Sequence, residues 1–475
     1  MRRYPLLFLV IWLLIGSPHP SEAQATQETV FTLENMYQLV LQNHPIAKQA
    51  NLLSENAQMN IRMARGYFDP KAISNFNGKE FKDKNYYQLW DSHLKVPLWI
   101  GQLKVGYERN TGINLNPQSD TNSGKGLAYV GVEIPILKGL LFDERRAALR
   151  KAQAMQSEAE AKQVSLINKL ILQIAKDYWN WFFTYHQFQL ADEGYKLANF
   201  RYKAVVDQMR LGALAALDTV EAKITIQQRE INLKNAKLAF ENAGLILSNH
   251  LWDESGNAVV LGETLIPISD INQNLQIEPF EDIIKLANQH PDLRVLNAKY
   301  QQLDIERKLN AEMLKPELTF NYNFLDQSAF SDNSLSDLMI DNSFTQNYKA
   351  GVSFSVPLFL RKERGKLGMT KVKLEKVRLE QQNLQQQIVT KVGAMYNTMN
   401  NFKEVLVMQE SMVNNYEQLL SGELQKFNAG ESSVFYVNVR EGKLLEAQSK
   451  LFKIRAELAK SVAELKWAAG LGITL

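Results

Sequence analysis

The chain has 475 residues, of which 45% are hydrophobic and 22% are charged, and its formal net charge is +3. Such a small net charge gives no indication of a nucleic-acid partner. The sequence contains no cysteine, which excludes disulfides, thiolate metal sites, a cysteine nucleophile and a lipid-modified N-terminal cysteine. The chain must therefore fold by noncovalent packing alone.

Residues 1–23 are predicted to be a secretory signal peptide. Arg2 and Arg3 precede an apolar run over residues 6–15, and small residues stand at the two positions that a signal peptidase reads before a cut after Ala23. This run is too short to span a membrane as a helix, and no other segment is long and apolar enough to do so. If the mature chain enters a membrane, it must therefore do so with strands.

The mature chain contains an internal repeat. Each half is predicted to contain a helix, a strand region, a very long helix, a turn and a medium helix. The prolines and glycines between these elements recur at matching places. The matched positions are His44-Pro45 with His290-Pro291, Pro135 with Pro357, and Gly212 with Gly430. We therefore expect a first repeat at 24–252, a linker at 253–279 and a second repeat at 280–475.

In the first repeat, a helix is predicted at 33–66, strands within 71–135 and a helical hairpin at 143–250. The first arm of the hairpin has no proline and carries apolar residues at helical spacing. The second arm has two apolar columns, each with a seven-residue period. One column is Leu217, Ile224, Ile231, Leu238 and Leu245, and the other is Ile226, Leu233, Phe240 and Leu247.

The two columns lie about 200° apart on a helix of 3.6 residues per turn. A helix that rests on a globular core has one apolar stripe, so two stripes predict a helix with a neighbour on each side, as in a wall of helices. An ordinary antiparallel bundle is the simpler alternative. Two short helices stacked end to end would match the length of the long helix beside them.

In the second repeat, helices are predicted at 281–314 and in a hairpin at 364–469, with strands at 317–325 and 346–356. Both strand segments alternate between apolar or aromatic residues and polar ones. This pattern suits either an outer-membrane barrel or one face of a soluble sandwich. The first repeat could supply two strands or four, too few in either case for one chain to close a barrel, so other copies would have to complete it.

The sequence resembles the TolC family of outer-membrane efflux proteins. The resemblance rests on the paired layout and on two turn segments, and it covers essentially the whole mature chain. The turn segments are Leu211-Gly212-Ala213-Leu214-Ala215-Ala216-Leu217-Asp218 and Phe427-Asn428-Ala429-Gly430-Glu431-Ser432-Ser433-Val434.

The resemblance implies a mainly α fold with a β-barrel part: two repeats of long coiled-coil helices and strands, in a homotrimer. Its joint barrel would contact outer-membrane lipid, and its helices would extend as an α-barrel through the periplasm. The tips would form the periplasmic aperture and meet a periplasmic adaptor, itself bound to an inner-membrane pump of an efflux or type I secretion system. The implied tip residues are Leu211, Gly212, Ala213, Leu214, Asp218, Phe427, Gly430, Glu431, Ser432 and Tyr436.

The tips also depart from the family pattern. Asp218 stands where members often carry an aspartate, but its counterpart in the second repeat is Tyr436. Ser432 occupies a place where some members have a basic residue. A lock at this aperture would therefore have a different chemistry from the ion pairs in parts of the family.

No catalytic constellation, cofactor site or metal site is expected. The matched His44 and His290 could form a metal pair, but no other histidine or cysteine stands at ligand spacing, so a structural role is favoured. The aromatic cluster around Trp181 could bind cargo, although packing between helices is the simpler interpretation. A periplasmic or surface coiled-coil protein such as an adhesin remains the alternative function, and an enzyme is disfavoured.

Overall fold

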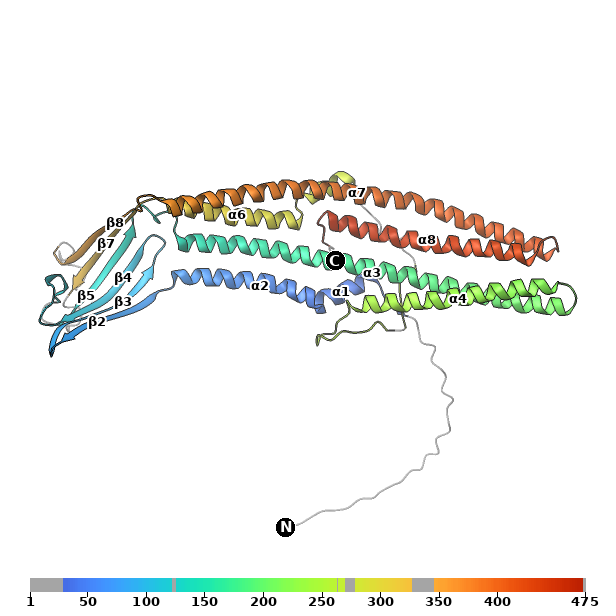
Figure 1. Ribbon diagram of the computed structural model, residues 1–475, viewed down its shortest axis with the longest axis horizontal. Helices are drawn as coiled ribbons and strands as arrows, with labels where there is room; N and C mark the ends of the chain where they lie inside the picture. The colour runs from blue at the N-terminus through green and yellow to red at the C-terminus, as the bar shows by residue number, and fades with distance from the viewer. Residues whose placement is uncertain (1–28, 122–124, 263, 270–277, 327–345, 473–475) are drawn as a thin grey trace, which may run out of the picture.

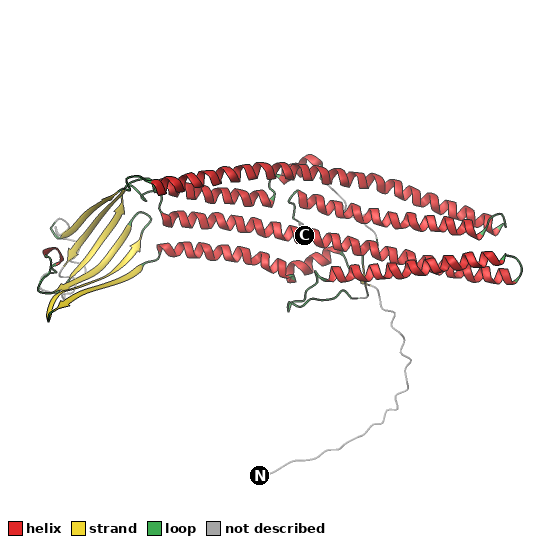
Figure 2. Ribbon diagram, viewed as in Figure 1, coloured by secondary structure: helices red, strands yellow, loops and turns green. Residues whose placement is uncertain are grey.

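The computed structural model is elongated, with a sheet at one end, long helices along its length and two helical turns at the far end (Figures 1 and 2). It describes residues 29–121, 125–262, 264–269, 278–326 and 346–472. The predicted signal peptide lies outside these residues, as do residues 327–345 between the two strands predicted for the second repeat. Within the described ranges, no helix has an apolar stretch long enough to cross a membrane.

Each half of the chain contains four helices within the described residues. The first repeat contains α1 (Leu33–Asn43), α2 (Pro45–Arg65), α3 (Glu144–Arg210) and α4 (Ala216–Ser248). The second contains α5 (Phe280–Ala287), α6 (Pro291–Glu312), α7 (Arg361–Asn428) and α8 (Val434–Ala468). In the described part of the linker, β6 (Leu265–Ile266) pairs in parallel with β1 (Thr29–Val30).

The single opening helix predicted for each repeat, 33–66 and 281–314, is in fact a pair of helices. A residue before proline is pushed toward an extended conformation, and His44 and His290 both have ψ at 135°. Each histidine Nδ1 accepts a hydrogen bond of 3.1 Å from the backbone N–H two residues ahead. The matched histidines are therefore helix caps. The described residues contain no group of three or more metal-binding side chains.

The helices form a wall that is four helices wide. Near the sheet, the contacts run in the order α2, α3, α6, α7, and toward the turns they run α4, α3, α8, α7. Figure 1 shows α2 and α4 end to end on one side of α3, with α6 and α8 end to end between α3 and α7. The end-to-end stacking predicted from helix lengths is therefore present.

The largest apolar core surrounds the middle of α3. Tyr178, Trp181 and Phe182 are at most 1% exposed and belong to one cluster with residues of α1, α4 and α8. The Tyr178 hydroxyl donates to the Phe31 carbonyl at 2.9 Å and accepts from the Ile268 N–H at 3.4 Å. The aromatic residues thus hold the first helices and the linker against α3, as the packing interpretation required.

The sheet is antiparallel and has six strands in the order β2, β3, β4, β5, β7, β8. The first repeat supplies β2 (Lys71–Phe81), β3 (Lys84–Pro97), β4 (Gln102–Thr111) and β5 (Leu127–Pro135), and the second supplies β7 (Glu317–Asp326) and β8 (Tyr348–Ser355). The first repeat therefore has four strands rather than two. The repeats join where β5 pairs with β7.

The two faces of the sheet differ in polarity. The register places Val130 opposite Phe324, and Phe324 opposite Tyr348, so aromatic and aliphatic side chains share one face. On the other face, the Tyr129 hydroxyl donates to Asp91 at 2.7 Å. Charged pairs on that polar face include Lys104 with Glu133 and Lys349 with Glu108. This alternation is what a sheet between lipid and water requires.

Candidate functional site at the helical tips

The first turn ends α3 with a glycine in the left-handed region. Gly212 has φ of +76°, its N–H donates to the Met209 carbonyl at 3.0 Å, and the Ala213 N–H donates to the Gln208 carbonyl at 2.9 Å. These two bonds satisfy carbonyls that the end of a helix leaves free, and the left-handed geometry favours glycine. The chain therefore reverses within a few residues.

The second turn has the same geometry. Gly430 has φ of +78°, its N–H donates to the Phe427 carbonyl at 3.0 Å, and the Glu431 N–H donates to the Lys426 carbonyl at 2.9 Å. No atom lies within 4 Å of the position that a Cβ would take at either glycine. Both glycines are therefore required by backbone conformation and not by crowding.

Asp218 closes the start of α4. Its carboxylate accepts a hydrogen bond of 3.1 Å from the Ala215 N–H, which satisfies one of the free donors at a helix N-terminus. The matching position at the start of α8 is Tyr436, which is 53% exposed. The two turns are therefore alike where they end a helix and different where they begin one.

The two turns pack against each other through apolar side chains. Leu214 of the first turn and Phe427 of the second contact one cluster formed by the buried Val205, Ala222 and Val434. Of the ten predicted tip residues, the structure thus brings these two together. Another apolar tip residue, Leu211, is 84% exposed.

Ser432 takes part in a contact within the second hairpin. Its hydroxyl donates to the Glu423 carboxylate at 2.5 Å, and the Arg440 guanidinium lies 3.4 Å from the other carboxylate oxygen. The Ser432 hydrogen bond, followed by Arg440, lowers the pKa of Glu423 below its usual value. Glu423 therefore stays ionised and holds the turn to its own helices.

An ionic cluster that the sequence did not reveal joins the hairpins farther from the tips. Glu441 of α8, with a side chain 4% exposed, pairs with Arg201 of α3 and lies 3.9 Å from Arg229 of α4. Arg201 also donates to Asn438 at 2.7 Å. These residues come from three helices, so no spacing along the chain signals their contact, and each by itself resembles a solvated surface charge.

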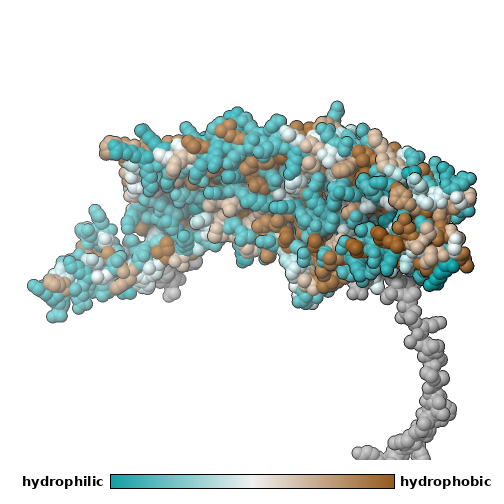
Figure 3. Space-filling model, turned by 45° about the vertical axis from the view of Figure 1, so that its right-hand side comes forward, coloured by the Kyte–Doolittle hydropathy of each residue, from teal (hydrophilic) through white to brown (hydrophobic). Residues whose placement is uncertain are grey.

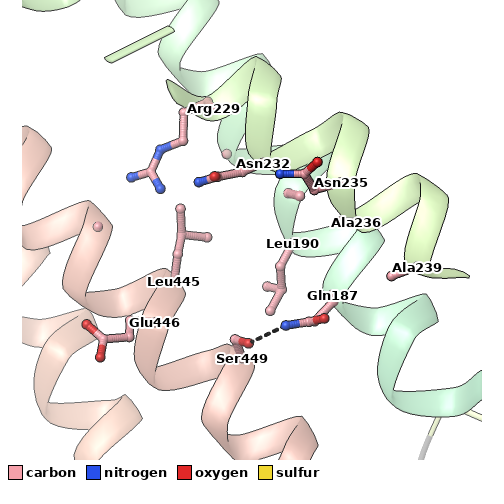
Figure 4. Close-up of a pocket in the computed structure, with 13 residues that line it drawn as sticks. Gln187, Leu190, Arg229, Asn232, Asn235, Ala236, Ala239, Leu445, Glu446 and Ser449 are labelled. Carbon is pink, nitrogen blue, oxygen red and sulfur yellow. Dashed lines mark hydrogen bonds between the residues drawn. The ribbon is translucent and has the colours of Figure 1, made fainter. Parts of the chain in front are cut away.

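A groove with a volume of about 410 Å³ lies beyond this cluster, between α3, α4 and α8 (Figure 4). Small residues, including Gly194 and Gly442, leave the space, while Gln187 donates to Ser449 across it at 3.3 Å. Among the lining residues, Glu446 is the one carboxylate, and there is no histidine or cysteine. The lining therefore lacks a pair of nucleophile and base.

The flank of the wall formed by α4 is apolar on its outside. The column Leu217, Ile224, Ile231, Leu238 and Leu245 is 54% to 76% exposed, whereas Leu247 of the other column is fully buried. Figure 3 shows apolar patches toward the lower edge and tip end of the helical body. The two-column pattern thus corresponds to one covered side and one uncovered side of α4.

Comparisons with known proteins agree with this architecture. Residues 101–250 and 283–471 match the model of a family described as outer membrane efflux protein. No curated protein matches the sequence.

Solved structures of outer-membrane channels are similar to the chain over most of its length. CmeC of Campylobacter jejuni is 14% identical, with a TM-score of 0.62 and coverage of 92% of this chain and 85% of that one. VceC of Vibrio cholerae is 14% identical, with a TM-score of 0.62 and coverage of 93% and 96%. MtrE of Neisseria gonorrhoeae, in an open state, is 14% identical, with a TM-score of 0.64 and coverage of 93% and 89%.

The family match covers most of the chain and confirms the resemblance seen in the sequence. It supports an outer-membrane efflux channel with a periplasmic helical extension, and no comparison supports an adhesin. The chain belongs to the outer membrane efflux protein family.

Proposed function

We propose that three copies of this chain form a passive duct that crosses the outer membrane and extends through the periplasm. The duct would supply a water-filled path and make or break no bond. Energy would come from an inner-membrane pump, reached through a periplasmic adaptor that meets the helical tips. Small molecules or proteins could be the cargo.

The observation that carries this proposal is the uncovered flank of α4. Five apolar residues at seven-residue spacing lie exposed along it. Such a column is the contact surface of a coiled coil, where a neighbouring helix buries it. At the opposite flank, α7 also exposes large apolar side chains, among them Val372, Val407 and Met408. A wall with two apolar flanks favours closure into a ring of identical copies.

The tips suit a contact with an adaptor. Leu211 and Leu217 of the first hairpin, and Phe435 and Tyr436 of the second, are each more than half exposed at the end farthest from the sheet. Exposed apolar side chains gathered in one place mark a protein interaction site. These residues, with the two glycine turns, would form the aperture.

Assembly can be tested with Leu238→Glu, which places a charge in the exposed column of α4. We expect purified protein in detergent to change from trimer to monomer by light scattering, because a buried carboxylate without a partner is costly. Lys237→Glu is the control, because it adds the same carboxylate about 100° around the helix. A trimer that survives Leu238→Glu, or a monomeric wild type, would contradict the proposal.

The aperture can be tested with Gly212→Pro and Gly430→Pro. Proline fixes φ near −65°, whereas these positions have φ of +76° and +78°. We expect both variants to impair export while membrane insertion and trimer formation persist, because the turns lie at the end far from the sheet. Equal loss of insertion and export would argue against a role at the aperture.

A further inference from the structure

The polar face of the sheet carries a row of three lysines at the end where the sheet meets the helices. Lys71, which begins β2 just after α2 (Figure 1), pairs directly with Lys95 of β3, and Lys95 pairs directly with Lys104 of β4. Residues directly opposite on neighbouring strands share a face and lie about 5 Å apart. Lys104 is on the polar face, where it pairs with Glu133. The lysine row, Lys71, Lys95 and Lys104, therefore crosses three neighbouring strands at one level.

The positive charge of the lysine row is only partly balanced. The Glu133 carboxylate pairs with Lys104 and accepts a hydrogen bond of 2.6 Å from Gln102. Its charge also acts on Lys95, but from beyond salt-bridge distance. Among the described residues, no carboxylate lies within salt-bridge distance of Lys71 or Lys95. One carboxylate thus faces three lysines.

The other carboxylates of the polar face are not placed to neutralise the row. Glu317 of β7 has a lysine of its own, Lys138, at 3.7 Å. Asp91 and Glu108, which are directly opposite each other, stand four residues along their strands from the lysine row, a distance of roughly 13 Å. Lys71 and Lys95 therefore give this end of the face an excess of positive charge.

A row of like charges does not stabilise a sheet. Like charges directly opposite on neighbouring strands repel each other and are destabilising. They do attract ions of the opposite sign, and rings of lysine or arginine side chains line pores for anions and phosphate groups. Walls of low dielectric constant concentrate such a field and raise the local concentration of the attracted ions. Lipid around a membrane-spanning sheet is a wall of this kind.

We propose that the lysine row attracts anions at the level where the sheet of the duct meets its helices, so that the duct favours anionic cargo. This rests on the duct proposed above, in which the polar face lines the water-filled path. It adds the chemical class of the cargo: molecules that carry carboxylate, sulfonate or phosphate groups. Three copies of the chain would bring three such rows to one level of the path.

The preference for anions can be measured as the reversal potential of the full-length protein in planar bilayers under a gradient of potassium chloride. We expect the wild type to conduct chloride better than potassium. The double variant Lys71→Gln with Lys95→Gln should lower the permeability ratio of chloride to potassium by about twofold or more. Because these substitutions remove repulsion between neighbouring strands, the sheet should still form.

The matched control is Lys82→Gln with Lys84→Gln. It removes the same two charges from the same hairpin of β2 and β3, but at the end far from the helices, where both lysines are exposed. The far end of the hairpin is roughly 35 Å from the lysine row, well beyond the range of a charge in salt solution. We expect this variant to keep the permeability ratio of the wild type.

A third variant, Glu133→Gln, should change the ratio in the opposite direction. It removes the carboxylate that pairs with Lys104 and so adds to the excess of positive charge, which should raise the permeability ratio of chloride to potassium. Inorganic pyrophosphate serves as a second probe. It should reduce the current through the wild type and through Glu133→Gln more than the current through the Lys71→Gln, Lys95→Gln variant.

A wild type that conducts without favouring chloride would overturn the inference and leave the proposed duct intact. The same conclusion follows if the ratio is unchanged in the Lys71→Gln, Lys95→Gln variant, or if it falls equally in the control. The absence of any conductance in the wild type and in all variants would instead overturn the duct itself.

Discussion

The two longest helices have the same place in their repeats but different surroundings. α3 has 67 residues and α7 has 68, and each runs from the sheet to a glycine turn. Yet α3 buries 20 of its residues, whereas α7 buries 8. α3 lies between α2 and α4 on one side and α6 and α8 on the other, but α7 lies at the edge of the wall. The number of buried residues in these two helices therefore depends on their position in the wall and not on their length.

This difference identifies the flank on which a neighbouring copy would pack in the proposed trimer. The buried side chains of α3 include Trp181 and Tyr178, which face other helices of the same chain. Large apolar side chains of α7 such as Val407, 67% exposed, have no such cover. In the proposed trimer, a neighbouring copy would give this edge helix the cover that the central helix already has.

The largest effect that we expect concerns the core of α3. Trp181→Ala removes an indole that is 1% exposed and stacks on Phe240 with ring centroids 6.3 Å apart. We expect a loss of about 3–5 kcal/mol in the free energy of unfolding. Val407→Ala on α7 should change it by less than about 0.5 kcal/mol in the isolated chain. Urea unfolding in detergent measures both, and equal losses would refute the contrast between the helices.

A second expectation concerns His186, which is buried in α3 and stacks on Phe452 with ring centroids 4.1 Å apart. Burial lowers the pKa of His186 from 6.5 to about 4. Because the folded state favours the neutral ring, the stabilising contribution is complete above pH 6.5. It is lost as the pH falls from 6.5 to about 4, and a shift of this size corresponds to about 3 kcal/mol.

His186→Phe should remove this component of acid sensitivity. The measurement is the urea midpoint between pH 4 and pH 7 for the variant and the wild type. His93→Phe, a change of the same kind in the sheet, is the control. Parallel pH profiles for His186→Phe and the wild type would show that the ring does not titrate as its burial requires.

A third expectation concerns the cluster that joins α3 to α8. Glu441→Gln removes the charge that faces Arg201 and Arg229, and we expect a loss of about 2 kcal/mol because two cations remain near a buried site. The loosened hairpins should also raise the ion conductance in planar bilayers. Glu446→Gln is the control on the same helix, since its carboxylate is 49% exposed and exposed pairs contribute little. Unchanged stability and conductance with Glu441→Gln would argue against this cluster as a tie between hairpins.

We expect the smallest loss in the free energy of unfolding at the glycine turns that end α3 and α7, and it should be the same at both. Gly212→Ala and Gly430→Ala each force alanine into the left-handed region, at a cost of about 1 kcal/mol. Both sites are open, so the two losses in unfolding free energy should agree even though α3 and α7 differ elsewhere. Unequal losses would indicate that one turn is held by contacts that its twin lacks.

Much of the fold could be predicted from local patterns. Apolar periodicity and the absence of proline predicted the long helices. The two columns of α4 predicted a neighbour on each side, and the chain itself supplies a neighbour on only one of them, since the column from Leu217 to Leu245 is exposed. The break at His44 was missed, although Pro45 gives a signal for it, because the apolar period continues across the break. The number of strands in the first repeat could not be decided from the sequence, because the alternation of apolar and polar residues is irregular before β5.

The tip residues were named from the resemblance and the glycine turns, and their roles at an aperture remain a proposal. What the sequence could not reveal is the contact of Leu214 with Phe427 through a shared cluster, or the pairing of Arg201 with Glu441. Each contact joins residues more than two hundred positions apart on different helices. No periodicity within one helix encodes which residue of another helix lies opposite.

By itself, the sequence determined the long helices, the turns, the repeat and the alternating polarity of the two strands in the second repeat, because these depend on neighbours within a few residues. Only the tertiary structure decided that α3 is central and α7 is at an edge, and that six strands continue four helices. Those outcomes depend on which helices and strands lie side by side. That lateral order follows from packing between segments that are remote in the chain, so patterns within one segment do not encode it.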